Sequence, residues 1–140
     1  MVGRKTHGWR PQIETEIHAQ GLPFPPEIIL ALVDLESNGD PNAVNAKSGA
    51  IGLTQLMPVA IRDYNRRRGT AHTKAEIAAS PDLQLRIGID IFALFVRGAY
   101  NLLAPILPDM SVQDLITTGL MSYVQGPGRT RQMLAPFAHP

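Results

Sequence analysis

The sequence of 140 residues lacks cysteine and has almost no net charge. Without cysteine, the chain can form neither disulfides nor cysteine-ligated zinc sites. Its 13 basic residues stand against 12 acidic residues, and a net charge of +1 gives no argument for a nucleic-acid partner. The histidines have no metal-ligand spacing: His7, His18, His72 and His139. We therefore expect no metal and no other cofactor.

Long apolar runs are also missing from the sequence. No stretch approaches the ~20 apolar residues that a membrane-spanning helix needs, so we expect no membrane span. Residues 1–10 carry charge but lead into no apolar segment, which is unlike a secretory signal. The sequence therefore predicts a chain without a signal peptide.

Helical patterns dominate what is present. An apolar fraction of 44% is enough for a folded core, and 140 residues favour a single domain. Apolar residues recur at helical spacing, whereas strand signals are nearly absent, which predicts an all-α fold. The expected helices cover residues 11–20, 27–37, 58–68 and 73–79, a long stretch from Ser80 onward, a stretch after Ser111 with Asp114 in its cap, and a last stretch over 129–134.

Two features refine this prediction. The long helix is apolar on too many sides for a surface helix, so we expect it to be the buried central helix. Gly88 inside it costs about 1 kcal/mol relative to alanine, which predicts that another helix packs closely there. Residues 38–50 are expected to form a loop with room for a small hairpin, and residues 52–57 a short helical turn.

Glu36 is the strongest candidate for chemistry. It follows the apolar segment 28–35 and falls at the C-terminal end of the helix expected there. The helix dipole and the apolar neighbours both disfavour the ionised carboxylate, so they raise its pKa. A carboxyl that stays protonated near neutral pH is suited to general acid catalysis.

Two motifs give the chain a family resemblance. The first comprises Glu36-Ser37, Pro41, Ala43-Val44 and the block Gly49-Ala-Ile-Gly-Leu-Thr-Gln-Leu-Met-Pro58, and the second is Ser122-Tyr-Val-Gln-Gly-Pro-Gly128. Together they resemble the lytic transglycosylase domain of the soluble-lytic-transglycosylase type, which is similar to goose-type lysozyme. The resemblance covers roughly residues 26–130. It implies a lysozyme-like helical domain over 26–140, preceded by an extension over 1–25 with a short helix.

The resemblance also implies an activity. Such domains cleave the glycan strands of bacterial peptidoglycan between N-acetylmuramic acid (MurNAc) and N-acetylglucosamine (GlcNAc). Glu36 would act as the single general acid and base, and the muramoyl 6-hydroxyl would close a 1,6-anhydro ring. The expected partner is peptidoglycan, and the expected state is a monomer.

Other residues take supporting roles by the same resemblance. Ser37 would orient Glu36 or its helix end, Gln55 would hydrogen-bond the sugar, and Met57 would line the sugar cleft. Asn45 and Gly52 would support the loop, and the Tyr123 hydroxyl would approach Glu36. The family asparagine after this tyrosine is Val124 here, and valine cannot make its polar contacts. Gln125 is the candidate to replace them from one position along.

Two other functions remain open. A hydrolysing muramidase on the same fold would need a second carboxylate to position water, for which Asp40 and Asp63 are the candidates. A structural or wall-binding virion protein would keep the fold with weak catalysis, as Val124 suggests. Because no secretory signal is seen, we expect a bacteriophage or prophage origin, with delivery in the virion or as an endolysin released through a holin.

A basic cluster follows the motif block. It consists of Arg62, Arg66, Arg67 and Arg68, with His72 and Lys74 nearby. It can be a solvated helix end stabilised by the helix dipole, or a surface that attracts the acidic cell wall.

Overall fold

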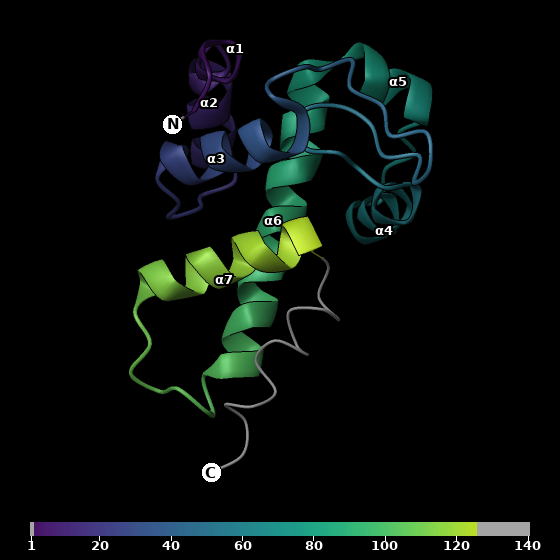
Figure 1. Cartoon of the computed structure of the whole chain (residues 1–140). Helices are drawn as coiled ribbons and strands as arrows, with labels where there is room; N and C mark the ends of the chain where they lie inside the picture. The colour runs from purple at the N-terminus through teal and green to yellow at the C-terminus, as the bar shows by residue number, and fades with distance from the viewer. Residues whose placement is uncertain (1, 126–140) are drawn as a thin grey trace. The chain divides into compact units, whose positions relative to one another are not determined.

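The protein is described by a computed structural model that places residues 2–125. These residues form seven α-helices and no strand longer than an isolated bridge (Figure 1). The helices are α1 (Arg4–His7), α2 (Arg10–Ala19), α3 (Pro26–Ser37), α4 (Pro58–Arg68), α5 (Lys74–Ala79), α6 (Pro81–Leu103) and α7 (Val112–Gln125). The all-α prediction is confirmed. None of the helices in this part of the chain is long and apolar enough to cross a membrane.

The chain divides into two compact units, Met1–Ile91 and Phe92–Pro140, so the boundary lies inside α6. The first unit contains α1 to α5 and the first part of α6. The second contains the rest of α6 and α7. The division predicted from the sequence has its boundary elsewhere, between an extension over 1–25 and a domain over 26–140, and it stays a prediction.

Local signals set the helix ends in the first unit. Proline lies in the first turn of α2, α3 and α4 and begins α6, where the missing N–H costs no intrahelical bond. Thr73 caps α5, because its hydroxyl accepts a hydrogen bond of 3.2 Å from the backbone N–H of Glu76. The predicted capping residue and the predicted span of α4 are therefore confirmed.

The core of the first unit joins α2, α3, α5 and α6. Its fully buried side chains include Ile13, Leu32, Val33, Ile77, Ile87 and Ile89. Burying a large aliphatic side chain contributes roughly 1.5–3 kcal/mol, so this cluster holds α3 firmly in place. The first part of α6 supplies part of this core, as expected for a buried helix.

The N-terminal residues dock onto the same helix α3. The Asp34 carboxylate accepts hydrogen bonds from the Thr6 hydroxyl at 2.7 Å and the Gly3 N–H at 3.1 Å. The Trp9 indole N–H donates to the Gly39 carbonyl at 2.9 Å. The short helix α1, which the sequence pattern did not predict, is held by these contacts.

The second unit pairs α7 with the later part of α6. The ring of Tyr123 meets the rings of Phe92 and Phe95 edge-on, with centroids 6.3 and 5.3 Å apart. Gly119 lets the helices approach, since a Cβ there would lie 2.6 Å from a methyl carbon of Val96. Ser111 caps α7 by accepting from the Asp114 N–H at 3.1 Å, as predicted.

Candidate active site

Glu36 is the penultimate residue of α3. The helix buries Ile29, Leu30, Leu32 and Val33 on its core side, while Leu35 is 65% exposed, so Glu36 lies at the edge of the core and is half-buried. This burial raises the pKa of Glu36 to about 7. The direction agrees with the expectation from the sequence. A carboxyl with this pKa can both give and take a proton near neutral pH.

A backbone reversal ends α3 two residues after Glu36. Asn38 adopts the left-handed conformation at φ 53°, and its N–H donates to the Asp34 carbonyl at 3.0 Å. Asparagine is one of the few residues that tolerate this conformation. The chain then turns back toward α6 as the loop over residues 38–57, which Figure 1 shows between α3 and α4.

Ser37 joins the end of α3 to this loop. Its hydroxyl lies 2.8 Å from the Leu53 carbonyl and 3.0 Å from the Val33 carbonyl, with the shorter bond going to the loop. The residue next to Glu36 is therefore bonded to the segment that carries Gln55.

Within the loop, the chain reverses direction twice. Val44 bridges Ile51, and Ile51 bridges Leu56, in both cases antiparallel. The predicted short helical turn over 52–57 is wrong, because residues 52–55 form a turn closed by the Ile51–Leu56 pair. Two left-handed residues, Gly52 at φ 82° and Gln55 at φ 52°, exclude a right-handed helix there.

Two predicted site residues hold this loop together. The Asn45 side-chain oxygen accepts from the N–H groups of Lys47 at 3.0 Å and Ser48 at 3.1 Å, which closes the tip. The Gln55 amide nitrogen donates to the carbonyls of Ala43 at 3.2 Å and Gly52 at 3.1 Å. Its side-chain oxygen accepts no hydrogen bond from residues 2–125.

A buried residue of α6 supports the loop from below. Gln84 is fully buried, and its side-chain oxygen accepts from the Leu53 N–H at 2.8 Å. Gly52 passes so close that a Cβ would lie 2.5 Å from the Gln84 side chain. The sequence analysis did not select Gln84. The available signal was a polar residue inside an apolar helix, four positions before Gly88 and so on the same face.

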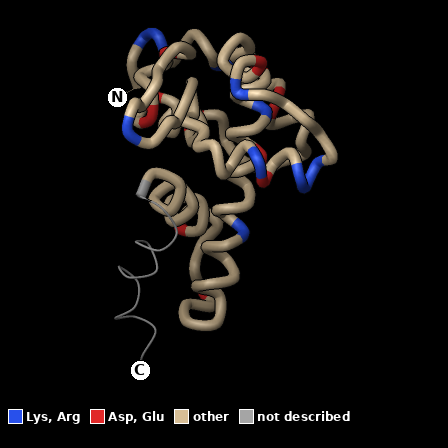
Figure 2. The backbone as a smooth tube through the Cα atoms, turned by 90° about the vertical axis from the view of Figure 1, so that its right-hand side faces the viewer, with Lys and Arg blue, Asp and Glu red and all other residues tan. Residues whose placement is uncertain are grey.

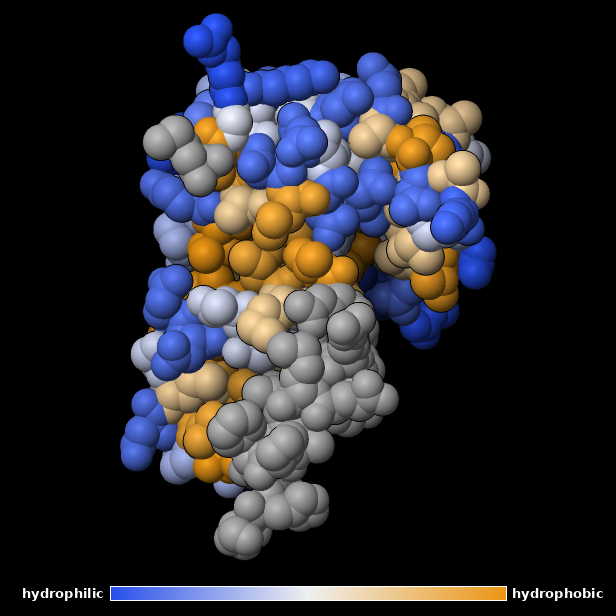
Figure 3. Space-filling model, in the orientation of Figure 1, coloured by the Kyte–Doolittle hydropathy of each residue, from blue (hydrophilic) through white to orange (hydrophobic). Residues whose placement is uncertain are grey.

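Apolar side chains are exposed on the loop and at the start of α4. Met57, at the start of α4, is 39% exposed, and Val44 and Val59 are more so, at 67% and 61%. Figure 3 shows a further apolar surface over α3. Exposed apolar side chains beside polar groups are typical of a ligand-binding surface.

The two candidate second carboxylates have structural partners. Asp40 accepts from the Asn42 N–H at 2.9 Å in a turn and lies 3.8 Å from the Lys5 ammonium. Asp63 accepts from Arg66 at 2.6 Å and Arg67 at 2.8 Å, and these bonds, chiefly that of Arg67, lower its pKa. Each carboxylate is explained by its local fold.

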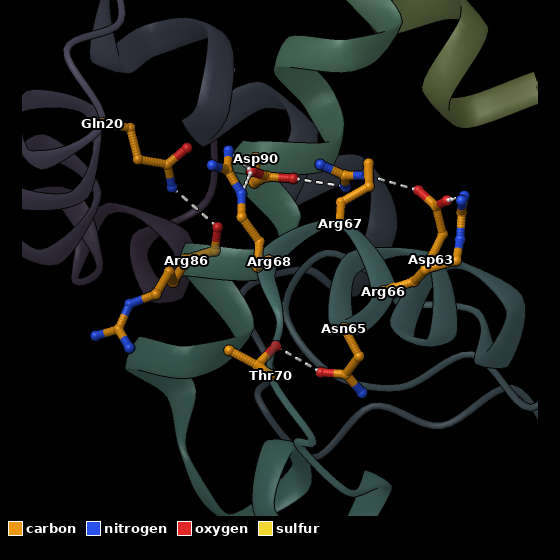
Figure 4. Close-up of polar contacts among 9 residues, drawn as sticks. All are labelled: Gln20, Asp63, Asn65, Arg66, Arg67, Arg68, Thr70, Arg86 and Asp90. Carbon is orange, nitrogen blue, oxygen red and sulfur yellow. Dashed lines mark hydrogen bonds and ion pairs between the residues drawn. The ribbon is translucent and has the colours of Figure 1, made fainter.

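The predicted basic cluster is largely an ion-pair network (Figure 4). Asp90 of α6 is 4% exposed and is bound by Arg67 at 2.7 Å and by Arg68. These two arginines attach α4 to α6. This role differs from both alternatives considered for the cluster, a solvated helix end and a surface that attracts the cell wall. Figure 2 shows acidic residues interspersed with the basic ones along this unit. Within residues 2–125, no group of His, Asp and Glu could hold a metal ion.

The second motif lies in the other unit. Tyr123 and Val124 belong to α7, where Val124 is 43% exposed, and Gln125 is the last residue of that helix. The approach of the Tyr123 hydroxyl to Glu36 stays a prediction. The motif residues 126–128 and the helix expected over 129–134 lie outside the described residues.

Comparison with known proteins gives a family match. The family model for the transglycosylase SLT domain matches residues 16–137. An endo-type membrane-bound lytic murein transglycosylase A of Klebsiella pneumoniae subsp. pneumoniae is 27% identical over 132 residues, which cover 86% of this chain and 62% of that protein. A protein of the same name from Salmonella paratyphi B is 33% identical over 123 residues, covering 86% and 56%. The chain thus spans about three-fifths of the length of the curated relatives it matches.

Proposed function

The chain belongs to the transglycosylase SLT domain family, and from this membership we propose that it cleaves the glycan strands of peptidoglycan. The bond cleaved is the β-1,4 linkage between MurNAc and GlcNAc, and Glu36 is the single general acid and base. The observation that carries the proposal is the half-buried carboxyl of Glu36, whose pKa of about 7 suits both proton transfers.

The reaction proceeds in two proton transfers. The protonated Glu36 gives its proton to the glycosidic oxygen as the bond from that oxygen to C1 breaks and positive charge develops on the muramoyl ring. The resulting carboxylate then takes the proton of the muramoyl 6-hydroxyl, whose oxygen bonds to C1. Glu36 ends protonated, as it began, and no water is consumed.

The bonding of the other carboxylates supports a single-carboxylate mechanism. A hydrolase would need a second carboxylate to activate water, and Asp40 and Asp63 are both engaged in structural bonds. The 6-hydroxyl of the substrate supplies the nucleophile instead.

The loop residues form the sugar-binding side of the proposed site. The Gln55 side-chain oxygen accepts from a sugar hydroxyl, and Met57 offers an apolar surface to a sugar ring. Ser37, Asn45 and Gly52 fix the loop that carries them. The role expected for Tyr123 toward Glu36 stays a prediction, as does that of Gln125 in place of the family asparagine.

The experiment is mass spectrometry of the products released from purified peptidoglycan. Muropeptides ending in anhydro-MurNAc, lighter by one water than reducing ends, support the proposal. Reducing ends would establish the hydrolase, and no product from folded protein would favour the wall-binding role. Glu36→Gln should abolish release, whereas Glu27→Gln is the matched control, because Glu27 is exposed in the first turn of the same helix.

The oligomeric state and the delivery of the protein are separate questions. We propose that it acts as a monomer, which sedimentation at working concentration tests. Delivery by a bacteriophage stays a prediction; the relatives named above are bacterial proteins described as membrane-bound.

A further inference from the structure

A single buried amide connects three segments of the first unit. Gln84, in the second turn of α6, is fully buried. Its nitrogen lies 3.1 Å from the Pro41 carbonyl, at the start of the loop, and 3.1 Å from the Ile77 carbonyl, in α5. Its oxygen accepts from the Leu53 N–H, in the turn. One acceptor and two donors are thus all used.

These bonds continue to the residue beside Glu36. The Leu53 N–H donates to Gln84 at 2.8 Å, and the Leu53 carbonyl accepts from the Ser37 hydroxyl at 2.8 Å. Leu53 is itself fully buried. Two hydrogen bonds and one residue, Leu53, therefore connect the core helix α6 to the end of α3 that carries Glu36.

Close packing leaves this connection little freedom. A Cβ on Gly52 would overlap the Gln84 side chain, and one on Gly88, a turn further along α6, would overlap Thr54. The turn is thus pressed against α6 on both sides of Leu53. Loss of the Gln84 amide would leave the buried Leu53 N–H without its partner, which favours displacement of the turn.

We propose that Gln84 is a positioning residue for Glu36. Through Leu53 and Ser37 it fixes the catalytic end of α3 relative to the loop that carries Gln55. The proposal rests on the proposed function of Glu36 and adds a residue that touches neither substrate nor the reacting atoms.

The variant Gln84→Glu tests the proposal, because the protonation state of its carboxyl changes with pH. A protonated carboxyl keeps one acceptor and one O–H donor in nearly the shape of the amide, whereas the carboxylate has no donor. Burial raises the pKa of a carboxyl at this position. At about pH 5, we expect the variant to release product at a rate within about twofold of the wild-type rate at the same pH. At about pH 8, its rate should be about tenfold or more below that of wild type.

Gln20→Glu is the matched control. The Gln20 amide also reaches α6, donating to the Arg86 carbonyl at 2.9 Å (Figure 4), but Gln20 is only half-buried, whereas Gln84 is fully buried. Its variant should follow the wild-type pH profile. Circular dichroism at each pH shows whether the variants are folded.

Ser37→Ala breaks the other end of the connection without burying a charge. We expect kcat to fall about three- to tenfold with KM within about twofold, since the sugar contacts remain. The Glu36 pKa, followed by NMR of its carboxyl carbon, should fall below about 7 as water reaches the carboxyl. If Gln84→Glu does not fold, Ser37→Ala alone tests the proposed connection.

The inference is overturned if folded Gln84→Glu follows wild type at every pH, or if Ser37→Ala changes neither kcat nor the Glu36 pKa. Failure of the proposed function would look different, because the wild type itself would release no product. The NMR titration of wild type and Ser37→Ala would still decide the positioning role in that case.

Discussion

Gly88 of α6 and Thr54 of the loop are in contact so close that a Cβ on the glycine would lie 2.3 Å from the threonine hydroxyl. The sequence predicted a close approach at Gly88 but assigned it to another helix. A loop makes the contact instead, because the turn over 52–55 folds against α6.

The first prediction tests this contact. Gly88→Ala should destabilise the protein by about 1–3 kcal/mol, because overlap with Thr54 outweighs the better helix propensity of alanine. Gly98→Ala, in the same helix, is the control. An added Cβ there meets nothing within 4 Å, so the change should stabilise by up to about 1 kcal/mol. Urea unfolding measures both, and equal effects would contradict the packing.

The second prediction concerns the buried carboxylate of Asp90. Asp90→Asn should lower the free energy of unfolding by about 3 kcal/mol, because Arg67 and Arg68 lose the charge that pairs them. Asp63→Asn is the control, since Asp63 is 38% exposed where it pairs with Arg66 and Arg67, and its loss should cost at most about 1 kcal/mol. Urea unfolding at neutral pH separates them, and similar losses would mean that burial of Asp90 adds nothing.

Much of the helical framework could be predicted because its signals are local. Proline at the start of α4 and the Thr73 cap of α5 act within one turn of helix. The same holds for Glu36, whose raised pKa follows from its place at the end of an apolar segment.

The remaining features depend on residues far apart in the chain. Asp34 bonds Thr6, 28 positions away, and Gln84 bonds Leu53, 31 positions away. Asp90 pairs with Arg67 across 23 positions. No periodicity indicates such partners, because each side chain alone is also consistent with a solvated position.

The third prediction uses the pKa of Glu36. In the folded protein burial raises this pKa to about 7, above the ordinary glutamate pKa of 4.5. Between these values the unfolded chain releases its proton first, so ionisation favours unfolding as the pH rises. Glu36→Gln should therefore match wild type in stability at about pH 4 and exceed it at about pH 8 by about 1–2 kcal/mol, a range discounted for the partial solvent exposure of the group.

Urea unfolding across this pH range checks the third prediction without any substrate. Glu27→Gln is again the control, and its stability difference from wild type should not grow in the same way. A Glu36→Gln variant that is no more stable at high pH than at low pH would show that the carboxyl is not held in a desolvated state.

The fourth prediction concerns Val124, which stands where the family has asparagine. Val124 is 43% exposed on α7, so Val124→Asn should change the free energy of unfolding by no more than about 0.5 kcal/mol. If that position contacts the sugar, the new amide adds a hydrogen bond to substrate, and kcat/KM should rise about three- to tenfold. The rate of product release from purified peptidoglycan measures the change.

Val112→Asn is the control for the fourth prediction, because Val112 is 66% exposed at the other end of the same helix. It should leave kcat/KM unchanged. A rise with Val124→Asn alone would locate a sugar contact at that end of α7. Equal rates for both variants would mean that this chain binds its glycan without that contact, and Gln125→Ala would then test whether the next residue along has taken its place.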